Sequence, residues 1–198
     1  MYFQFETDRC YVKALKLDNR QKNKDEKQGN DAHPRALDAF LQKNMEEERI
    51  ELGVMDIHTD QVIGVAESKG RELYASNFMP LSPKKSNYAI QWRELCLDYQ
   101  EGNEFFSPVR CCEYLGQFYV VDGKKRVSVL KYLEVPSVCA NVIRIVPAMS
   151  KDRDMQNYLD SLRSFKKTNL FQISFPAAGH GADNSADRFT PQQCFAAG

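Results

Sequence analysis

Residues 109–146 constrain the fold more than any other part of the sequence, because extended and helical segments alternate there with short connections. The apolar and β-branched residues on either side of Gly116-Gln117 predict a β-hairpin. After the hairpin the chain passes through Asp122-Gly-Lys-Lys-Arg126 into a helix that Pro136 ends. A long apolar strand follows, so both strands and helices must be accommodated in one core. The predicted elements of this run are strands 109–115, 118–121 and 138–146 and helix 127–133.

The helix predicted over residues 88–101 has the clearest periodicity in the chain. Its apolar side chains recur at i, i+4, i+7, i+8 and i+11, which is typical of one buried face. They are Tyr88, Trp92, Leu95, Cys96 and Tyr99. Gly102 ends this helix. The remaining core elements that the patterns predict are strands 50–57 and 61–65, loop 77–83, helix 151–167 and edge strand 171–175.

The first 49 residues are predicted to form a helical arm that precedes the core. Residues 9–17 fit a short amphipathic helix, and residues 18–31, with four positive and four negative charges, predict a solvated helix end and a loop. Pro34 suits the start of a second short helix, with Ala36, Leu37, Phe40 and Leu41 on one face. Glu46 to Glu48 form a charged connector. The predicted division is therefore an arm at 1–49, a core at 50–176 and a disordered tail at 177–198.

The composition excludes several classes of protein. The chain has 198 residues with 42% hydrophobic residues, which is enough for a core. Its 27 basic and 27 acidic residues give a net charge of zero, so an anion site must be a local cluster. No apolar run reaches the roughly 18 residues that a membrane helix needs. No secretory signal is visible at the N-terminus, and we expect a cytoplasmic protein.

The six cysteines do not predict a metal site. They form no Cys-x-x-Cys pair, and no histidine lies near them at zinc-binding spacing. Cys111 and Cys112 are adjacent in a predicted strand, so their side chains should point to opposite faces. Reduced thiols in a reducing compartment are the favoured interpretation. The histidines His33, His58 and His180 are scattered and receive no catalytic role.

The turn at residues 122–126 is the strongest candidate for a binding site. Gly123 permits a sharp turn from strand to helix, and the first helical turn offers free backbone N–H groups. Cations are unfavourable at the positive end of a helix dipole, yet three of them stand there in succession. A phosphate or another anion bound at the turn would explain this placement. The residues predicted to bind it are Gly123, Lys124, Lys125, Arg126 and Ser128. The pattern is not a P-loop.

The segment from Phe118 to Pro136 resembles the signature segment of the ParB/sulfiredoxin superfamily, in which a strand precedes Asp-Gly-x-x-Arg and a helix. The wider chain is similar to a bacterial group with a ParB-like N-terminal domain, through Asn77-Phe-Met-Pro-Leu81 and other short matches between residues 10 and 176. The resemblance implies a small α+β domain with a mixed β-sheet flanked by helices. It also implies that the Gly-x-x-Arg turn binds the phosphates of a nucleotide.

The branches of this superfamily differ at the turn. Sulfiredoxins place a catalytic cysteine where this chain has Lys124, so that activity is not expected. ParB partition proteins have a glutamate there that is tied to CTP hydrolysis, and they carry a helix-turn-helix after the core, which is not predicted here. A third branch phosphorylates a free amino acid and uses an N-terminal carboxylate as general base. By that resemblance Glu67 and Asp122 are the candidate catalytic residues.

These observations lead to one leading hypothesis and several alternatives. We expect a nucleotide or phosphate-binding domain, with CTP, ATP or ADP and Mg²⁺ as candidate ligands and a regulatory or DNA-associated role through a partner. The binding rim would include Lys69, Arg71 and Asn77. The alternatives are a small-molecule phosphotransferase or a nucleotide hydrolase, a nuclease, and a single-stranded nucleic-acid binder. The last would use the aromatic and basic side chains Tyr119, Tyr132 and Lys131.

Overall fold

Six strands form one mixed β-sheet in the computed structural model, which describes residues 2–39, 41, 47–102, 107–147 and 153–168. The order across the sheet is β1-β3-β5-β4-β6-β2. Parallel pairs are β1/β3, β3/β5 and β4/β6, whereas β4/β5 and β2/β6 are antiparallel. The α+β fold that the sequence predicted is confirmed. The strands are β1 (Arg35–Ala36), β2 (Glu47–His58), β3 (Val62–Val65), β4 (Val109–Tyr114), β5 (Gln117–Asp122) and β6 (Ser137–Pro147).

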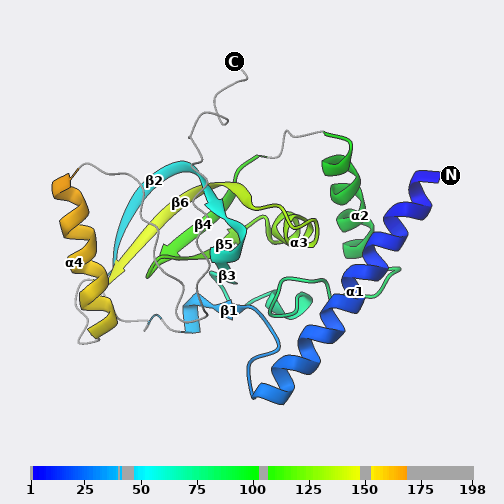
Figure 1. Ribbon diagram of the computed structural model, residues 1–198, viewed down its shortest axis with the longest axis horizontal. Coiled ribbons are helices and arrows are strands. Elements are labelled where there is room, and N and C mark those ends of the chain that lie inside the picture. Colours follow the sequence, from blue (N-terminus) through cyan, green and yellow to red (C-terminus); the bar gives the residue numbers. More distant parts are fainter. Residues whose placement is uncertain (1, 40, 42–46, 103–106, 148–152, 169–198) are drawn as a thin grey trace, which may run out of the picture.

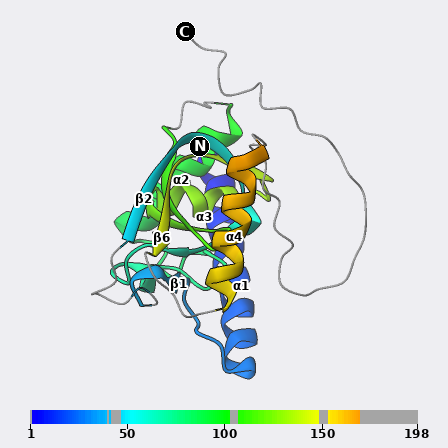
Figure 2. The same ribbon diagram turned by 90° about the vertical axis from the view of Figure 1, so that its left-hand side faces the viewer.

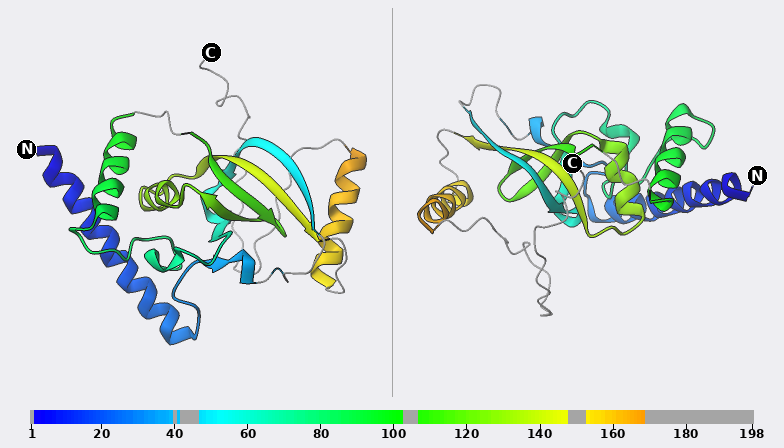
Figure 3. Two further views of the ribbon diagram at one scale, coloured as in Figure 1. Left: turned by 180° about the vertical axis from the view of Figure 1, so that it is seen from behind. Right: turned by 90° about the horizontal axis from the view of Figure 1, so that it is seen from above.

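The helices flank the sheet at its two ends. Figure 1 shows α4 beside one end of the long strands, while the other helices gather at the opposite end. The view from above in Figure 3 gives the same separation, with α1 and α4 at opposite extremes of the molecule. The helices are α1 (Tyr2–Gln28), α2 (Asn87–Gln100), α3 (Lys124–Tyr132) and α4 (Arg153–Thr168).

The predicted β-hairpin is present, with its turn one residue earlier than expected. Leu115 and Gly116 occupy the turn with φ of 54° and 75°. Two successive positive φ angles match the twist of the flanking strands, which favours a two-residue turn. The Gly116 N–H donates to the Glu113 carboxylate at 2.7 Å and so fixes the turn. Gln117 therefore belongs to β5 and pairs with Tyr114.

The helical end of the molecule has its own aromatic core. The predicted stripe of α2 is confirmed at Trp92 and Cys96, both of which are completely buried. The Trp92 ring meets Tyr11 of α1 and Tyr132 of α3 edge-on, each at 5.3 Å between centroids. Ser86 caps α2 by accepting a hydrogen bond from the Ala89 N–H at 3.1 Å. One tryptophan thus joins three helices that lie far apart in sequence.

The two faces of the sheet carry separate apolar clusters. Cys111 packs with Val120 and Val142 on one face, whereas Cys112 packs with Tyr119 and Ile145 on the other. The prediction that adjacent cysteines point to opposite faces is confirmed. Burial raises the pKa of the Cys111 thiol to about 12, so this thiol is not a nucleophile at neutral pH.

A buried polar cluster joins α4 to the sheet. Glu113 of β4 is 2% exposed, and its carboxylate accepts the hydrogen bond of the Tyr158 hydroxyl, which lies 2.6 and 2.8 Å from the two carboxylate oxygens. Arg144 of β6 pairs with the same carboxylate. Burial, and then the neighbouring Glu113 charge, raise the pKa of the Tyr158 phenol. Figure 2 shows α4 standing in front of the sheet, where this cluster holds it.

The N-terminal segment differs from its prediction. One helix, α1, continues without a break from Tyr2 to Gln28, through the stretch that was expected to become a loop. Tertiary contacts explain the difference, because Asp18 and Asp25 are buried at 3% and 4% exposure. The Ser76 hydroxyl donates to Asp25 at 2.5 Å, which ties the helix end to a distant loop.

The helix predicted after Pro34 is also wrong. Arg35 and Ala36 form strand β1 and pair with Gly64 and Val65 of β3, and a short 3-10 turn follows at Leu37–Ala39. At Gly64 a Cβ would lie 2.3 Å from the Arg35 carbonyl oxygen, so this close strand approach requires glycine. The connector predicted at 46–48 becomes the start of β2 at Glu47. Edge strand 171–175 and tail 177–198 lie outside the described residues.

Candidate functional site

The turn between β5 and α3 is built around Gly123. Its φ of 94° lies in the left-handed region, which glycine adopts without steric cost. A Cβ at this position would approach a Val109 methyl carbon at 2.8 Å and the Arg126 guanidinium at 2.9 Å. Both the backbone conformation and the lack of space for a Cβ therefore require glycine at position 123. It brings the end of a central strand directly to the start of a helix.

The first turn of α3 presents unpaired backbone donors. The first intrahelical bond runs from the Val127 N–H to the Gly123 carbonyl at 3.0 Å, so the N–H groups before it have no acceptor within the helix. Gly123 caps the helix without any side-chain hydrogen bond, and the first turn contains no acidic residue. Free N–H groups and the helix dipole together favour an anion at this point.

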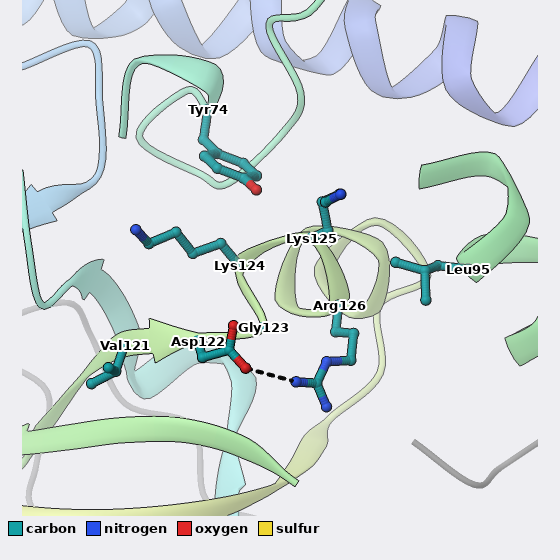
Figure 4. A pocket seen from close by; sticks show the side chains of 8 residues that line it. All are labelled: Tyr74, Leu95, Val121, Asp122, Gly123, Lys124, Lys125 and Arg126. Carbon is teal, nitrogen blue, oxygen red and sulfur yellow. Dashed lines mark ion pairs between the residues drawn. The ribbon is translucent and has the colours of Figure 1, made fainter. Parts of the chain in front are cut away.

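A pocket of about 390 Å³ opens beside this turn. Figure 4 shows its lining, in which the polar residues of the turn lie together with Val121 of β5, Tyr74 of a preceding loop and Leu95 of α2. The residues that line it are Tyr74, Leu95, Val121, Asp122, Gly123, Lys124, Lys125 and Arg126. A volume of this size is within the range of small-molecule sites. The mixed lining suits a ligand with a charged end and an apolar or ring-shaped part.

The three cations extend in different directions from the turn (Figure 4). Lys124 donates to the Lys69 carbonyl at 3.2 Å, and Lys125 donates to the Gln91 side chain and lies 5.6 Å from the centre of the Tyr88 ring. Both lysines thus contact neutral oxygens rather than carboxylates. Their charge is available to an anion, and flexible lysine side chains can exchange these partners for phosphate oxygens.

Arg126 has a different environment from the two lysines. Its guanidinium donates to the carbonyl of Ser107 and, at 3.1 Å, to the Ser107 hydroxyl. It also lies 3.6 Å from the Asp122 carboxylate, whose side chain is 68% exposed. These contacts place Arg126 as a support of the turn, with one edge toward the pocket, while Asp122 is the carboxylate among the pocket-lining residues.

Ser128 must be removed from the predicted anion site. Its side chain is completely buried, and its hydroxyl accepts a hydrogen bond from the Trp92 indole N–H at 2.9 Å. The i, i+4 spacing from Lys124 suggested one polar face, but Ser128 packs toward α2. The Ser128 hydroxyl is the hydrogen-bond acceptor for the buried Trp92 indole N–H. Sequence spacing could not distinguish this structural role from ligand binding.

The predicted rim residues do not line the pocket. Arg71 pairs with Asp31 at 2.7 Å and reaches the Pro34 carbonyl, so it fastens the N-terminal segment. Although partial burial opposes it, hydrogen bonds from the His33 N–H and Arg71 lower the pKa of Asp31. Asn77 accepts a hydrogen bond from the Met79 N–H at 3.0 Å and so stabilises its own loop.

Glu67 and Lys69, which were also predicted, lie in the turn after β3, and that turn reaches the site through a backbone contact alone. Glu67 is exposed in the turn that follows β3 and is not among the pocket-lining residues. Lys69 contributes its backbone carbonyl to Lys124, while its side chain is exposed. The structure therefore brings together Asp122, Gly123, Lys124, Lys125 and Arg126 from the predicted set.

The predicted platform for single-stranded nucleic acid is not assembled. Tyr119 is buried against Leu37, and Tyr132 packs edge-on against Trp92. Lys131 lies 5.6 Å from the centre of the buried Phe78 ring, and burial lowers its pKa. Tyr119 is buried and both Lys131 and Tyr132 are half-buried, so these three side chains form no row of exposed rings and cations.

The apolar side of the pocket was missed by the sequence analysis. Tyr74 comes from a loop about fifty residues before the turn, and no local pattern connects the two. Leu95 belongs to the predicted stripe of α2, and Val121 lies one residue before the end of β5, so both were assigned to the core. Only their positions relative to α3 identify them as pocket residues.

In the part of the chain that the structure describes, no three histidine, cysteine, aspartate or glutamate side chains gather in a way that could hold a metal ion. None of the described helices combines the length and the apolar character that crossing a membrane requires.

Comparison of the chain with protein-family models, with curated proteins and with solved structures finds no match.

Proposed function

We propose that the pocket at the β5–α3 turn binds a nucleotide through its phosphates. The observation that carries this proposal is the first turn of α3, where unpaired N–H groups adjoin Lys124 and Lys125 and where no carboxylate of the described residues pairs with either lysine. Three successive cations at the positive end of a helix are unfavourable unless an anion binds there. The ParB/sulfiredoxin resemblance of the sequence remains part of the proposal.

Each part of the ligand has a suitable partner in this arrangement. The N–H groups of residues 124–126 would hold a phosphate, and the two lysines would contact its outer oxygens. Tyr74, Leu95 and Val121 would cover the ribose or base. Asp122 would bind Mg²⁺ together with phosphate oxygens, since Mg²⁺ takes few protein carboxylates when it is held on a nucleotide. Candidate ligands are CTP, ATP and ADP.

The role of such a domain is proposed to be regulatory, in association with DNA through a partner and in the cytoplasm. The described cysteines Cys10, Cys96, Cys111, Cys112 and Cys139 are free thiols, which suits a reducing compartment.

A second candidate function is phosphoryl transfer to a small acceptor. The observation in its favour is the exposed Asp122 carboxylate inside the pocket lining, beside the proposed phosphate position. A carboxylate there could accept the proton of an acceptor hydroxyl. Turnover that Asp122→Asn abolishes while nucleotide binding in the absence of Mg²⁺ persists would support this function over binding alone. Intact nucleotide after incubation with amino-acid and sugar acceptors would contradict it.

Calorimetric titration of the full chain with CTP, ATP and ADP, each with and without Mg²⁺, tests the proposal. We expect saturable heat with at least one nucleotide, and a loss of affinity of about tenfold or more in the Lys124→Gln/Lys125→Gln variant. The matched control is Lys84→Gln/Lys85→Gln, which changes another adjacent and exposed lysine pair. No heat with any nucleotide, or an equal loss in the control, would overturn the proposal.

A further inference from the structure

Helix α1 carries a continuous basic stripe on its outer face. Its members follow one another at intervals of three or four residues, and all are exposed. They are Arg9, Lys13, Lys16, Arg20, Lys24 and Lys27. At 100° per residue these positions fall within an arc of about 80° of the helix circumference, along a length of about 27 Å. We call these six residues the α1 stripe.

The α1 stripe lies opposite the face that packs on the protein. The buried side of α1 is formed by Tyr11, Ala14, Asp18 and Asp25, which lie about half a turn away from the stripe. Figures 1 and 3 show α1 along the outer edge of the molecule, with the sheet on its other side. The stripe is therefore presented as one straight line of charge.

Among the described residues, no ion pair neutralises a member of the stripe. Within the part of the chain that the structure describes, none of its six members forms an ion pair, although Lys22 on the flank of the same helix pairs with Glu26. Like charges at i, i+3 and i, i+4 destabilise a helix by a few tenths of a kcal/mol per pair. A solvated helix of a neutral protein would normally mix both signs of charge on its exposed face. Helix stability therefore does not explain the stripe.

We propose that the α1 stripe binds the sugar–phosphate backbone of a double-stranded nucleic acid. Cations that recur about every 5 Å along a rigid line suit a polyanion of high and regular charge density, and a duplex carries one phosphate charge about every 1.7 Å of its axis, which is more than one phosphate for each cation. Contacts of this kind carry no sequence information, so binding would be independent of base sequence.

The surroundings of the stripe favour nucleic acid over an anionic membrane. A helix that binds a membrane surface inserts its apolar face. In α1 that face is already buried against α2, through Tyr11 and Ala14, and Leu17 is the large apolar side chain exposed beside the stripe. The stripe is also separate from the pocket residues, so this proposal does not depend on nucleotide binding.

The test is fluorescence anisotropy of the full chain with a labelled DNA duplex of about 24 base pairs, between about 50 and 200 mM salt. Six phosphate contacts predict a slope of log K against log salt of about −5. In the Lys16→Glu/Arg20→Glu variant we expect affinity to fall at least tenfold and the slope to weaken by about two. Lys84→Glu/Lys85→Glu changes the net charge equally and serves as the control, with affinity retained.

Parallel measurements decide between the possible partners. An RNA duplex of the same length shows which nucleic acid is preferred, and binding to either duplex with the expected variant pattern supports the proposal. Binding to vesicles of anionic lipid without binding to a duplex would overturn it. So would the absence of duplex binding at the lowest salt, an equal loss in the control variant, or a loss caused by Lys124→Gln/Lys125→Gln instead.

Discussion

Two residues show how single positions set the local free energy of this molecule. Gly123 makes possible a turn that no other residue fits, because its φ is 94° and a Cβ would meet Val109 and Arg126. Asp18 shows the opposite situation. Its carboxylate is buried on α1, and one of its oxygens has no hydrogen-bond partner. The first residue defines the candidate site, and the second weakens the fold that supports it.

Replacement of Gly123 by alanine should destabilise the protein and weaken ligand binding together. We expect a loss of about 2–4 kcal/mol in the free energy of unfolding, from left-handed strain and from the clash with Val109. Gly29→Ala is the matched control, because Gly29 also has a positive φ but open space around it. It should lose only about 1–2 kcal/mol in the same denaturant titration and keep its nucleotide affinity. Equal losses in both variants would show that crowding at Gly123 has no effect.

Replacement of Asp18 by asparagine should stabilise the protein in a pH-dependent way. Burial raises the pKa of Asp18 to about 6 from an ordinary value of 3.8. The folded state therefore binds this proton more tightly than the unfolded state, and stability falls as the pH rises from about 4 to about 6. Asp18→Asn should gain about 1–2 kcal/mol at neutral pH and little near pH 4.

Denaturant titrations at the two pH values measure this difference. Asp25→Asn is the comparison, because Ser76 and Gln21 donate hydrogen bonds to the Asp25 carboxylate. That variant should lose stability at neutral pH. If Asp18→Asn were also destabilised at neutral pH, the buried carboxylate would have an attractive partner that outweighs its desolvation.

At the scale of elements, the packing of α2 against α3 determines which face of α3 is free for a ligand. Trp92 and Ser128 form a buried hydrogen bond between the two helices. This contact turns Val127, Ser128 and Val129 into the interior and leaves the first turn of α3 at the pocket. A helix of nine residues can present one face to a ligand only when its other faces are held in this way.

Replacement of Ser128 by alanine should therefore affect stability and leave ligand affinity unchanged. The Trp92 indole N–H would be left buried without an acceptor, at a cost of about 1–3 kcal/mol. Unfolding followed by the fluorescence of Trp92, the single tryptophan, measures this directly. Ser161→Ala, on the exposed surface of α4, should change little. A loss of nucleotide affinity at unchanged stability would show that Ser128 contributes to ligand binding after all.

At the scale of the whole molecule, the N-terminal segment contacts both the helical end of the structure and the edge of the sheet. Its helix α1 packs Tyr11 against Trp92, and its strand β1 extends the sheet beside β3. The predicted division into an arm at 1–49 and a core at 50–176 stays a prediction, although these contacts join the two parts through both an aromatic core and a backbone pairing.

These contacts predict that the chain unfolds in one cooperative transition. Thermal unfolding followed by Trp92 fluorescence reports on the helical end, and far-ultraviolet circular dichroism reports on all secondary structure. The two curves should coincide, since a shared core unfolds as a unit. Tyr11→Ala should shift both curves together, with a loss of about 3–5 kcal/mol. Separate transitions would establish the N-terminal arm as an independent unit.

Local patterns in the sequence determined the elements of the core and the centre of the candidate site. The periodicity around Trp92, the alternation around the hairpin and the Asp-Gly-Lys-Lys-Arg turn depend on neighbouring residues alone. In the structure α2 begins one residue before its predicted start, and the hairpin turn lies one residue earlier than expected. Helix α3 begins at Lys124, three residues before the predicted start at residue 127. Tertiary structure alone decided the strand order, the length of α1, the buried role of Ser128 and the contribution of Tyr74 to the pocket. The physical reason is that each of these depends on contacts between segments far apart in the chain, and a buried hydrogen bond such as that of Ser76 with Asp25 leaves no trace in the local sequence.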